Sequence, residues 1–274
     1  MKASCVKAVY FSPTGNAETV VTCIAQQMAE SLQLPMETID FTLPGAREGQ
    51  YCFTEEDIVV FGTPVYAGRI PNKLLPYVQS GFVGGGALAV PVAVYGNRNF
   101  DNGLIEACVE LEQHGFHTVA AVAVPTEHVF SDKLATGRPN EEDLAELKNF
   151  AKKAVEKITE AEAIPAPIEV PGDKALDAYY RPMGIDGKPT VFLKAKPVVD
   201  ETLCTKCGTC AGVCPMGSIP ADAPDTTAGI CIKCQACIKK CPNHARSFHD
   251  EAFLSHVAML EANFTRRAEI KTFL

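Results

Sequence analysis

The sequence predicts an α/β protein with a doubly wound parallel sheet, followed by a smaller α+β domain organised by cysteines. Short buried strands alternate with helices over residues 1–163, which is typical of a parallel sheet covered by helices on both faces. Closely spaced prolines at residues 164–171 (IPAPIEVP) stop the preceding helix and mark a domain boundary. Eight of the twelve cysteines follow between Cys204 and Cys241. A chain of 274 residues is long enough for one medium and one small domain.

The individual elements follow from hydrophobic spacing. Short runs rich in valine and aromatic residues predict buried strands, and apolar residues spaced three or four apart predict helices. The predicted strands are Val6–Phe11, Asp57–Gly62, Ala87–Gly96 and His117–Val124, and the predicted helices are Glu18–Leu32, Gly103–His114, Glu141–Glu162 and Asp250–Arg267. The last of these makes residues 250–274 an amphipathic C-terminal helix, which either packs on the first domain or enters a groove in a partner.

Three polar loops follow predicted strands, namely SPTGNA (Ser12–Ala17), TPVYAGRIP (Thr63–Pro71) and NRNFDN (Asn97–Asn102). Ligands of doubly wound sheets bind beyond the carboxyl ends of the strands. The first loop opens a helix, and the N–H groups of a helix N-terminus suit a phosphate, as do the hydroxyls of Ser12 and Thr14. Alone, this turn is equally a helix cap. Its place between strand and helix, with two further loops in order, favours a phosphate ligand.

Residues 3–163 resemble a flavodoxin in these three loops. The resemblance implies a sheet of order 2-1-3-4-5 and a bound FMN. The residues implied around the phosphate are Ser12, Thr14, Gly15, Asn16 and Ala17, and those around the ring and ribityl chain are Thr63, Pro64, Val65, Tyr66, Gly68, Arg69, Gly96, Asn97, Arg98 and Asp101. Ala17 departs from the flavodoxin pattern, in which Thr or Ser usually ends the phosphate turn. One phosphate hydrogen bond must therefore come from the backbone or another side chain.

Some of these side chains have a structural alternative. Tyr66 is also a candidate core aromatic, and Arg69 and Arg98 are candidate surface charges. The pair Glu127 and His128, near a strand end, is an acid–base candidate, but such pairs are more often structural, so no catalytic residue is assigned. Four cysteines without metal spacing are expected to be small buried hydrophobes, and these are Cys5, Cys23, Cys52 and Cys108.

The remaining cysteines form two copies of one motif. Cys204–Pro215 and Cys231–Pro242 both read C-x2-C-x2-C-x3-C-P, the run that binds 4Fe-4S clusters in bacterial ferredoxins. A zinc ribbon is the competing interpretation, because Cys207-x2-Cys210 and Cys231-x2-Cys234 have a loose zinc spacing. It leaves four cysteines and both C-P ends unexplained, so the spacing favours paired clusters.

The ferredoxin resemblance also implies that the fourth cysteine of each run crosses to the other cluster. The first cluster would then be held by Cys204, Cys207, Cys210 and Cys241, and the second by Cys214, Cys231, Cys234 and Cys237. This crossover makes residues 200–249 one interleaved ferredoxin domain. The connecting segment 164–199 is too apolar for a flexible linker and is expected to pack across both domains.

The whole chain resembles the ferredoxin-flavodoxin fusion proteins of anaerobic bacteria and archaea. The resemblance implies an electron-transfer flavoprotein, in which two 4Fe-4S clusters and FMN exchange electrons with each other and with redox partner proteins such as a ferredoxin or an oxidoreductase. Two alternatives stay open. FMN fed by the clusters could reduce a small organic acceptor or quinone in a site roofed by residues 172–199, or the protein could be an electron-transfer subunit of a larger redox complex.

Composition sets limits on other function classes. The net charge is -8, and the surplus of basic over acidic residues is confined to the cysteine region, so nucleic-acid binding is not expected. No apolar run reaches the roughly 18 residues that cross a bilayer. The first ten residues alternate apolar and polar residues and lack a secretory pattern, so a cytoplasmic protein is expected.

Overall fold

The computed structural model describes residues 3–176 and 178–274. Its main sheet has five parallel strands in the order β2-β1-β4-β6-β8. Numbered as strands of a parallel sheet, this order is 2-1-3-4-5, the flavodoxin-like arrangement, and the predicted fold class is confirmed. The strands are β1 (Cys5–Tyr10), β2 (Met36–Asp40), β4 (Asp57–Pro64), β6 (Leu88–Tyr95) and β8 (Ala121–Pro125).

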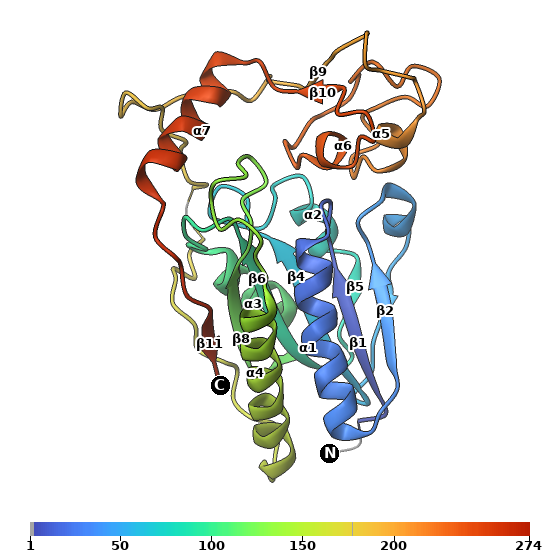
Figure 1. Ribbon diagram of the computed structural model, residues 1–274. Helices are drawn as coiled ribbons and strands as arrows, with labels where there is room; N and C mark the ends of the chain where they lie inside the picture. The colour runs from blue at the N-terminus through green and yellow to red at the C-terminus, as the bar shows by residue number, and fades with distance from the viewer. Residues whose placement is uncertain (1–2, 177) are drawn as a thin grey trace.

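Helices cover both faces of this sheet (Figure 1). On one face, α1 (Asn16–Leu32) and α4 (Glu141–Glu160) bury their apolar sides in a core shared with alternate residues of the strands. On the other face, α2 (Leu75–Val78) and α3 (Gly103–Gln113) pack over a core rich in phenylalanine. Because both faces are covered, β4 and β6 are buried almost throughout, as their continuous apolar sequences predict.

Several elements differ from the sequence prediction. The hydrophobic pattern misses β2, whose side chains are exposed or half-buried because it is an edge strand next to β1. The single strand predicted at 117–124 is two pieces, β7 (His117–Thr118) and β8, both paired with β6. Minor elements complete this domain, and they are η1 (Pro44–Arg47), β3 (Tyr51–Cys52) and β5 (Phe82–Val83).

The cysteine region lies above the carboxyl ends of the parallel strands (Figure 1). It contains two short helices, α5 (Thr209–Gly212) and α6 (Ala236–Lys239). An antiparallel pair, β9 (Val198–Val199) and β10 (Arg246–Ser247), joins its beginning to its end. The cysteine runs therefore sit over the edge of the sheet where ligands of this fold bind.

The chain then returns to the first domain. Helix α7 (Glu251–Asn263) ends four residues earlier than predicted, and β11 (Lys271–Phe273), which was not predicted, pairs antiparallel with β8. Buried Met259 and Leu260 of α7 pack with Leu134 of the first domain. In the described part of the chain, no helix is long and apolar enough to cross a membrane.

Two buried polar groups fix the returning tail. Asn97, after β6, donates its amide N–H groups to the carbonyls of Phe264 and Arg266, both at 2.7 Å. Arg138 donates to the carbonyl of Ala268 at 2.5 Å and forms two hydrogen bonds with the Asp143 carboxylate, at 2.9 and 2.6 Å. The tail is thus held by side chains whose own burial makes them sensitive to loss of a partner.

Candidate functional site

A cavity of about 630 Å³ lies at the carboxyl ends of β1, β4, β6 and β8. We call it the flavin cavity. Its volume falls within the range of roughly 300–1,000 Å³ that small-molecule and cofactor sites occupy. Ten residues of the implied FMN set line it, and they are Ser12, Thr14, Asn16, Ala17, Pro64, Val65, Tyr66, Gly68, Gly96 and Arg98. The three loops that the sequence singled out therefore meet at one place.

Five residues of that set lie behind the cavity wall. Gly15 is the N-cap of α1, with φ 98°, a backbone conformation that glycine adopts without strain. Thr63 is buried within β4, and Asn97 holds the tail. Asp101 forms an ion pair with Arg98. Arg69 forms an ion pair with fully buried Glu106, so it is neither a surface charge nor a lining residue.

The α1 end of the cavity fits a phosphate. The N-cap residue Gly15 has no side chain to cap this helix, but the Ser12 hydroxyl accepts the N–H of Glu18, the third residue of α1, at 2.9 Å. The Thr14 hydroxyl has no hydrogen-bond partner among the residues described. The remaining N–H groups of the first turn, beside this free hydroxyl, are a suitable anion site. Ala17 is 3% exposed and packs in the core under α1, which accounts for the missing hydroxyl at this position.

The connecting segment supplies an aromatic wall that the loop motifs did not predict. Tyr180 donates its N–H to the carbonyl of Ala67 at 2.8 Å, and Tyr179 donates its hydroxyl to the carbonyl of Ile70 at 2.9 Å. The guanidinium of Arg98 lies 3.9 Å from the ring centroid of Tyr180, a cation–π contact. The density of aromatic residues in this segment was the signal in the sequence. The reductase alternative placed residues 172–199 over the flavin, and the structure shows which of their side chains line the cavity.

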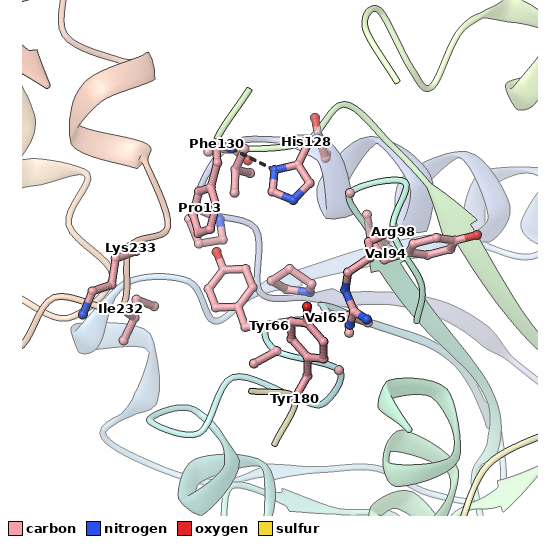
Figure 2. A pocket seen from close by; sticks show the side chains of 18 of the residues that line it. Pro13, Val65, Tyr66, Val94, Arg98, His128, Phe130, Tyr180, Ile232 and Lys233 are labelled. Atoms are coloured by element: carbon pink, nitrogen blue, oxygen red, sulfur yellow. Dashed lines mark hydrogen bonds between the residues drawn. The ribbon is translucent and has the colours of Figure 1, made fainter. Parts of the chain in front are cut away.

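Two histidines also line the cavity. His128 accepts the N–H of Phe130 at Nδ1, 3.0 Å away, as Figure 2 shows. Burial lowers the pKa of His128 to about 4, and the neighbouring His256, Arg98 and Lys239 contribute in the same direction. Burial likewise lowers the pKa of His256, whose Nδ1 is bonded to the carbonyl of Met183 at 2.8 Å. Both imidazoles are therefore neutral at pH 7.

The cysteines gather in two groups of four. One small cavity is lined by Cys204, Cys207, Cys210 and Cys241, and we call it the distal site. A second is lined by Cys214, Cys231, Cys234 and Cys237, and we call it the proximal site. These are the two sets that the ferredoxin crossover implies. Among the described residues, no three His, Cys, Asp or Glu side chains are grouped so as to hold one metal ion.

The two sites repeat the same local structure. Cys214 Sγ accepts the N–H of Ser218 at 3.3 Å, and Cys241 Sγ accepts the N–H of Ala245 at 3.4 Å, each four residues further on. Lys206 and Lys233, at equivalent places in the two runs, both have positive φ, of 53° and 58°. Hydrogen bonds to cluster sulfurs are among the features that set reduction potentials. The duplicated sequence therefore folds into duplicated sites.

The proximal site adjoins the flavin cavity. Cys231, Ile232 and Lys233 line both. Figure 2 shows Ile232 and Lys233 on the ferredoxin side of the cavity, facing Tyr66. Burial, followed by the nearby Cys234 and Cys231, raises the pKa of Tyr66 well above its usual 10. Tyr66 therefore lies between the flavin loops and the proximal cysteines.

The other cysteines fall outside both sites. Cys5 and Cys108 are buried, as expected for small hydrophobes, but Cys23 is half-buried and Cys52 is exposed. Cys52 belongs to a two-residue edge strand, where alternate side chains face solvent. The expectation of burial was therefore wrong for Cys52.

Comparisons with known proteins gave one family match and a set of similar solved structures. A family model described as a 4Fe-4S binding domain matches residues 197–219, which include the first cysteine run and support 4Fe-4S binding. The comparison with curated proteins found no match. Similar solved structures include a flavodoxin from the domain Archaea, with 16% identity over 57% of this chain and 99% of the other and a TM-score of 0.38. A Streptococcus pneumoniae TIGR4 flavodoxin has 17% identity over 56% of this chain and 99% of the other, with a TM-score of 0.40.

A third similar structure is the rubredoxin oxygen:oxidoreductase from the anaerobe Desulfovibrio gigas. It has 13% identity over 58% of this chain and 37% of the other, with a TM-score of 0.40.

Proposed function

We propose that this protein transfers electrons between two 4Fe-4S clusters and one FMN, and between these cofactors and external redox partners. The observation that carries the proposal is the shared wall of Cys231, Ile232 and Lys233, which places a four-cysteine site directly beside the flavin cavity. Clusters exchange single electrons and a flavin exchanges one or two, so the pair can connect one-electron and two-electron chemistry.

The residues present fit these cofactors. Cys204, Cys207, Cys210 and Cys241 would hold one cluster at the distal site, and the four proximal cysteines the other. Each iron of a 4Fe-4S cluster takes one thiolate. Eight cysteines in two groups of four around separate cavities support clusters over the zinc alternative, which accounts for only four of them. The N-terminus of α1 and the Thr14 hydroxyl would hold the FMN phosphate.

The order of the sites suggests a path for electrons. Cys207 of the distal site is exposed, whereas Cys234 of the proximal site is buried. The distal site is thus open to a partner protein, and the proximal site faces the flavin cavity across Tyr66. We infer that electrons exchange with a partner at the distal site and pass through the proximal site to FMN, or run in reverse.

The subunit alternative gains no support from α7. Its apolar residues Phe253, Met259 and Leu260 are buried against other parts of the same chain, so they offer no free face to a partner.

Anaerobic purification followed by iron, sulfide and flavin assays tests the proposal. We expect about eight irons and one FMN per chain, with electrons from a chemical reductant reaching both cofactor types in a redox titration. Zinc in place of iron, or protein that fails to take up FMN on reconstitution, would overturn it.

A further inference from the structure

The flavin cavity has a second wall that the strand-end loops do not provide. It comes from the connecting segment and α7, and its members are mostly aromatic or apolar. These are Tyr180, Pro182, Phe192, Leu193, His256 and Leu260. Phe192 lies 5.4 Å from His256 and 5.5 Å from Phe253, ring centroid to centroid, so the wall is tied into a buried aromatic cluster. Flat aromatic ligands stack on surfaces of this kind.

The hydrogen bonds of the two histidines fix their tautomers. A backbone N–H can only donate, so His128 Nδ1 is the acceptor of the Phe130 N–H, and the proton of neutral His128 lies on Nε2. A carbonyl can only accept, so His256 Nδ1 donates to Met183, and His256 Nε2 carries a lone pair. Among the described residues neither Nε2 atom has a hydrogen-bond partner, so the two lining histidines leave one imidazole N–H donor and one imidazole N acceptor unpaired.

The charged side chains on this side of the cavity already have partners. Arg98 pairs with Asp101. Lys233 donates to the carbonyls of Leu193 and Cys231, at 2.6 and 3.1 Å. Glu127 pairs with Lys239 at 2.7 Å. The other charged lining residue of the part that the structure describes, Lys73, is exposed and lies just after the Thr63–Pro71 loop. The wall thus favours an uncharged ligand.

We propose that His128, His256 and the aromatic wall form a subsite for a small uncharged quinone, next to the flavin. The ring would stack on Phe192 and Tyr180. One carbonyl oxygen would accept the Nε2–H of His128, and the O–H formed on reduction would donate to Nε2 of His256. The donor and acceptor suit a ligand whose oxygens change from acceptors to donors. This inference rests on the proposed electron-transfer function, which supplies the electrons.

The reaction balances without a net change in either histidine. The two quinone C=O groups would become C–OH with two electrons and two protons that a bound, reduced FMN would supply, leaving the flavin oxidised. An external one-electron donor would then deliver two electrons, one at a time, through the cysteine sites. With two protons from water, these electrons would restore the reduced flavin.

Binding to the oxidised holoprotein tests the subsite without turnover. The probe is 2,3-dimethyl-1,4-naphthoquinone, whose methyl groups block addition of the free cysteines, and the measurement is equilibrium dialysis. The matched control ligand is 2,3-dimethylnaphthalene, which keeps the rings and lacks both oxygens. We expect the quinone to bind about fivefold to tenfold more tightly than the control, as one or two net hydrogen bonds imply.

The variants are chosen to keep the structural bonds of each histidine. In His128→Asn the amide oxygen can accept the Phe130 N–H in place of Nδ1, and in His256→Asn the amide N–H can donate to Met183 in place of Nδ1. Asparagine has no counterpart of Nε2, so each variant loses only the group that would contact the ligand. His128→Asn should weaken quinone binding about fivefold and leave binding of the naphthalene unchanged. His256→Asn removes only the acceptor for the O–H of the reduced ligand, so it should leave quinone binding unchanged and weaken binding of 1,4-dihydroxy-2,3-dimethylnaphthalene to the reduced protein about fivefold. Phe192→Leu tests the aromatic wall and leaves both histidines in place. It should weaken binding of both the quinone and the naphthalene. His249→Asn, at an exposed histidine outside the cavity, is the matched control and should change neither.

Iron and flavin assays on the same samples separate the two proposals. If the holoprotein contains iron and FMN but binds the quinone no better than the naphthalene, the subsite is overturned and electron transfer stands. If FMN is missing and the quinone still binds with the same dependence on His128, the subsite stands and the electron-transfer proposal fails. If His128→Asn does not weaken quinone binding, the subsite is overturned and the aromatic wall only covers the flavin.

Discussion

Lys239 and Glu127 form an ion pair across the two cofactor regions, with 2.7 Å between Nζ and Oε1. Lys239 lies between Cys237 and Cys241, and Glu127 lies in the wall of the flavin cavity. About a third of each side chain is exposed, so solvent screens the attraction. We predict a coupling of less than about 1 kcal/mol in a double-mutant cycle of Lys239→Gln and Glu127→Gln. The coupling is measured from the opening free energies of α6 in hydrogen exchange. A value well above 1 kcal/mol would show that this ion pair controls how the cysteine region packs on the first domain.

Arg47 should matter more for the same interface. Its guanidinium donates to the carbonyl of Phe41 at 2.8 Å, and also to Thr42 and to Pro215 of the cysteine region. Hydrogen bonds from a charged donor contribute roughly 1.5–3 kcal/mol each, and the three are not additive. Arg47→Met should therefore lower the opening free energy at residues 216–218 by about 2–3 kcal/mol in hydrogen exchange. Arg181→Gln, at an exposed arginine, should leave it unchanged, and equal effects of the two would contradict the assignment.

The grouping of cysteines predicts which cluster each substitution removes. Cys241→Ser should impair the cluster held by Cys204, Cys207 and Cys210, and Cys214→Ser the cluster at the proximal site. Iron analysis with electron paramagnetic resonance of the reduced protein distinguishes the two spectra. Cys52→Ser is the control, because Cys52 is exposed and lines neither site, and its iron content should match the wild type. Loss of the proximal cluster in Cys241→Ser would refute the crossover.

His128 predicts a dependence of stability on pH. Burial and nearby positive charges lower its pKa from 6.5 to about 4. Between these values the unfolded chain binds more protons than the folded chain, so stability is full above pH 6.5 and falls as the pH drops towards 4. The two pKa values correspond to a loss of about 3 kcal/mol. Deuterium exchange of the imidazole C–H, followed by mass spectrometry, should give a midpoint well below 6.5. The loss of stability should shrink in His128→Asn.

Arg138 and Asp143 should be among the most sensitive residues of the first domain. Both side chains are nearly inaccessible, at 5% and 2% exposure, and Arg138 also binds the tail at Ala268. Replacing one member leaves the other charge buried, which costs about 3–5 kcal/mol. Arg138→Met should therefore lower the midpoint of thermal unfolding strongly. Arg267→Met provides a contrast, because Arg267 reaches Asp143 at 3.3 Å from an exposed position and should matter little.

The sequence predicts most of the strand-end loops because their chemistry is local. A turn with Ser12 and Thr14 before a helix, and two polar loops after buried strands, already imply the place where a ligand binds. Asn97 shows the limit of that reasoning. Its loop suits a flavin, yet its amide holds the carbonyls of Phe264 and Arg266, which lie more than 160 residues away. Only the folded chain shows such a partner.

The aromatic wall was harder to predict for a related reason. Tyr180 and Phe192 mark their segment as apolar, but no periodicity says which surface an irregular segment covers. Its path is fixed by single contacts, such as the Tyr180 N–H to the carbonyl of Ala67. His256 is on a helix with an apolar side, where a histidine is indistinguishable from a core residue in sequence. The edge strand β11 is only three residues long and too short for an alternating pattern.

The pairing of β11 with β8 has a consequence for biosynthesis. During translation the flavodoxin-like strands emerge first, then both cysteine runs, and only afterwards the segment Lys271–Phe273 that covers the edge of β8. Nascent domains generally fold from the N-terminus as they leave the ribosome. In this chain the edge of β8 stays unpaired until the cysteine region and the residues after it have been synthesised. Maturation of the two halves is therefore linked in time, because the edge of β8 is open to pairing with other chains until residues 271–273 have been made.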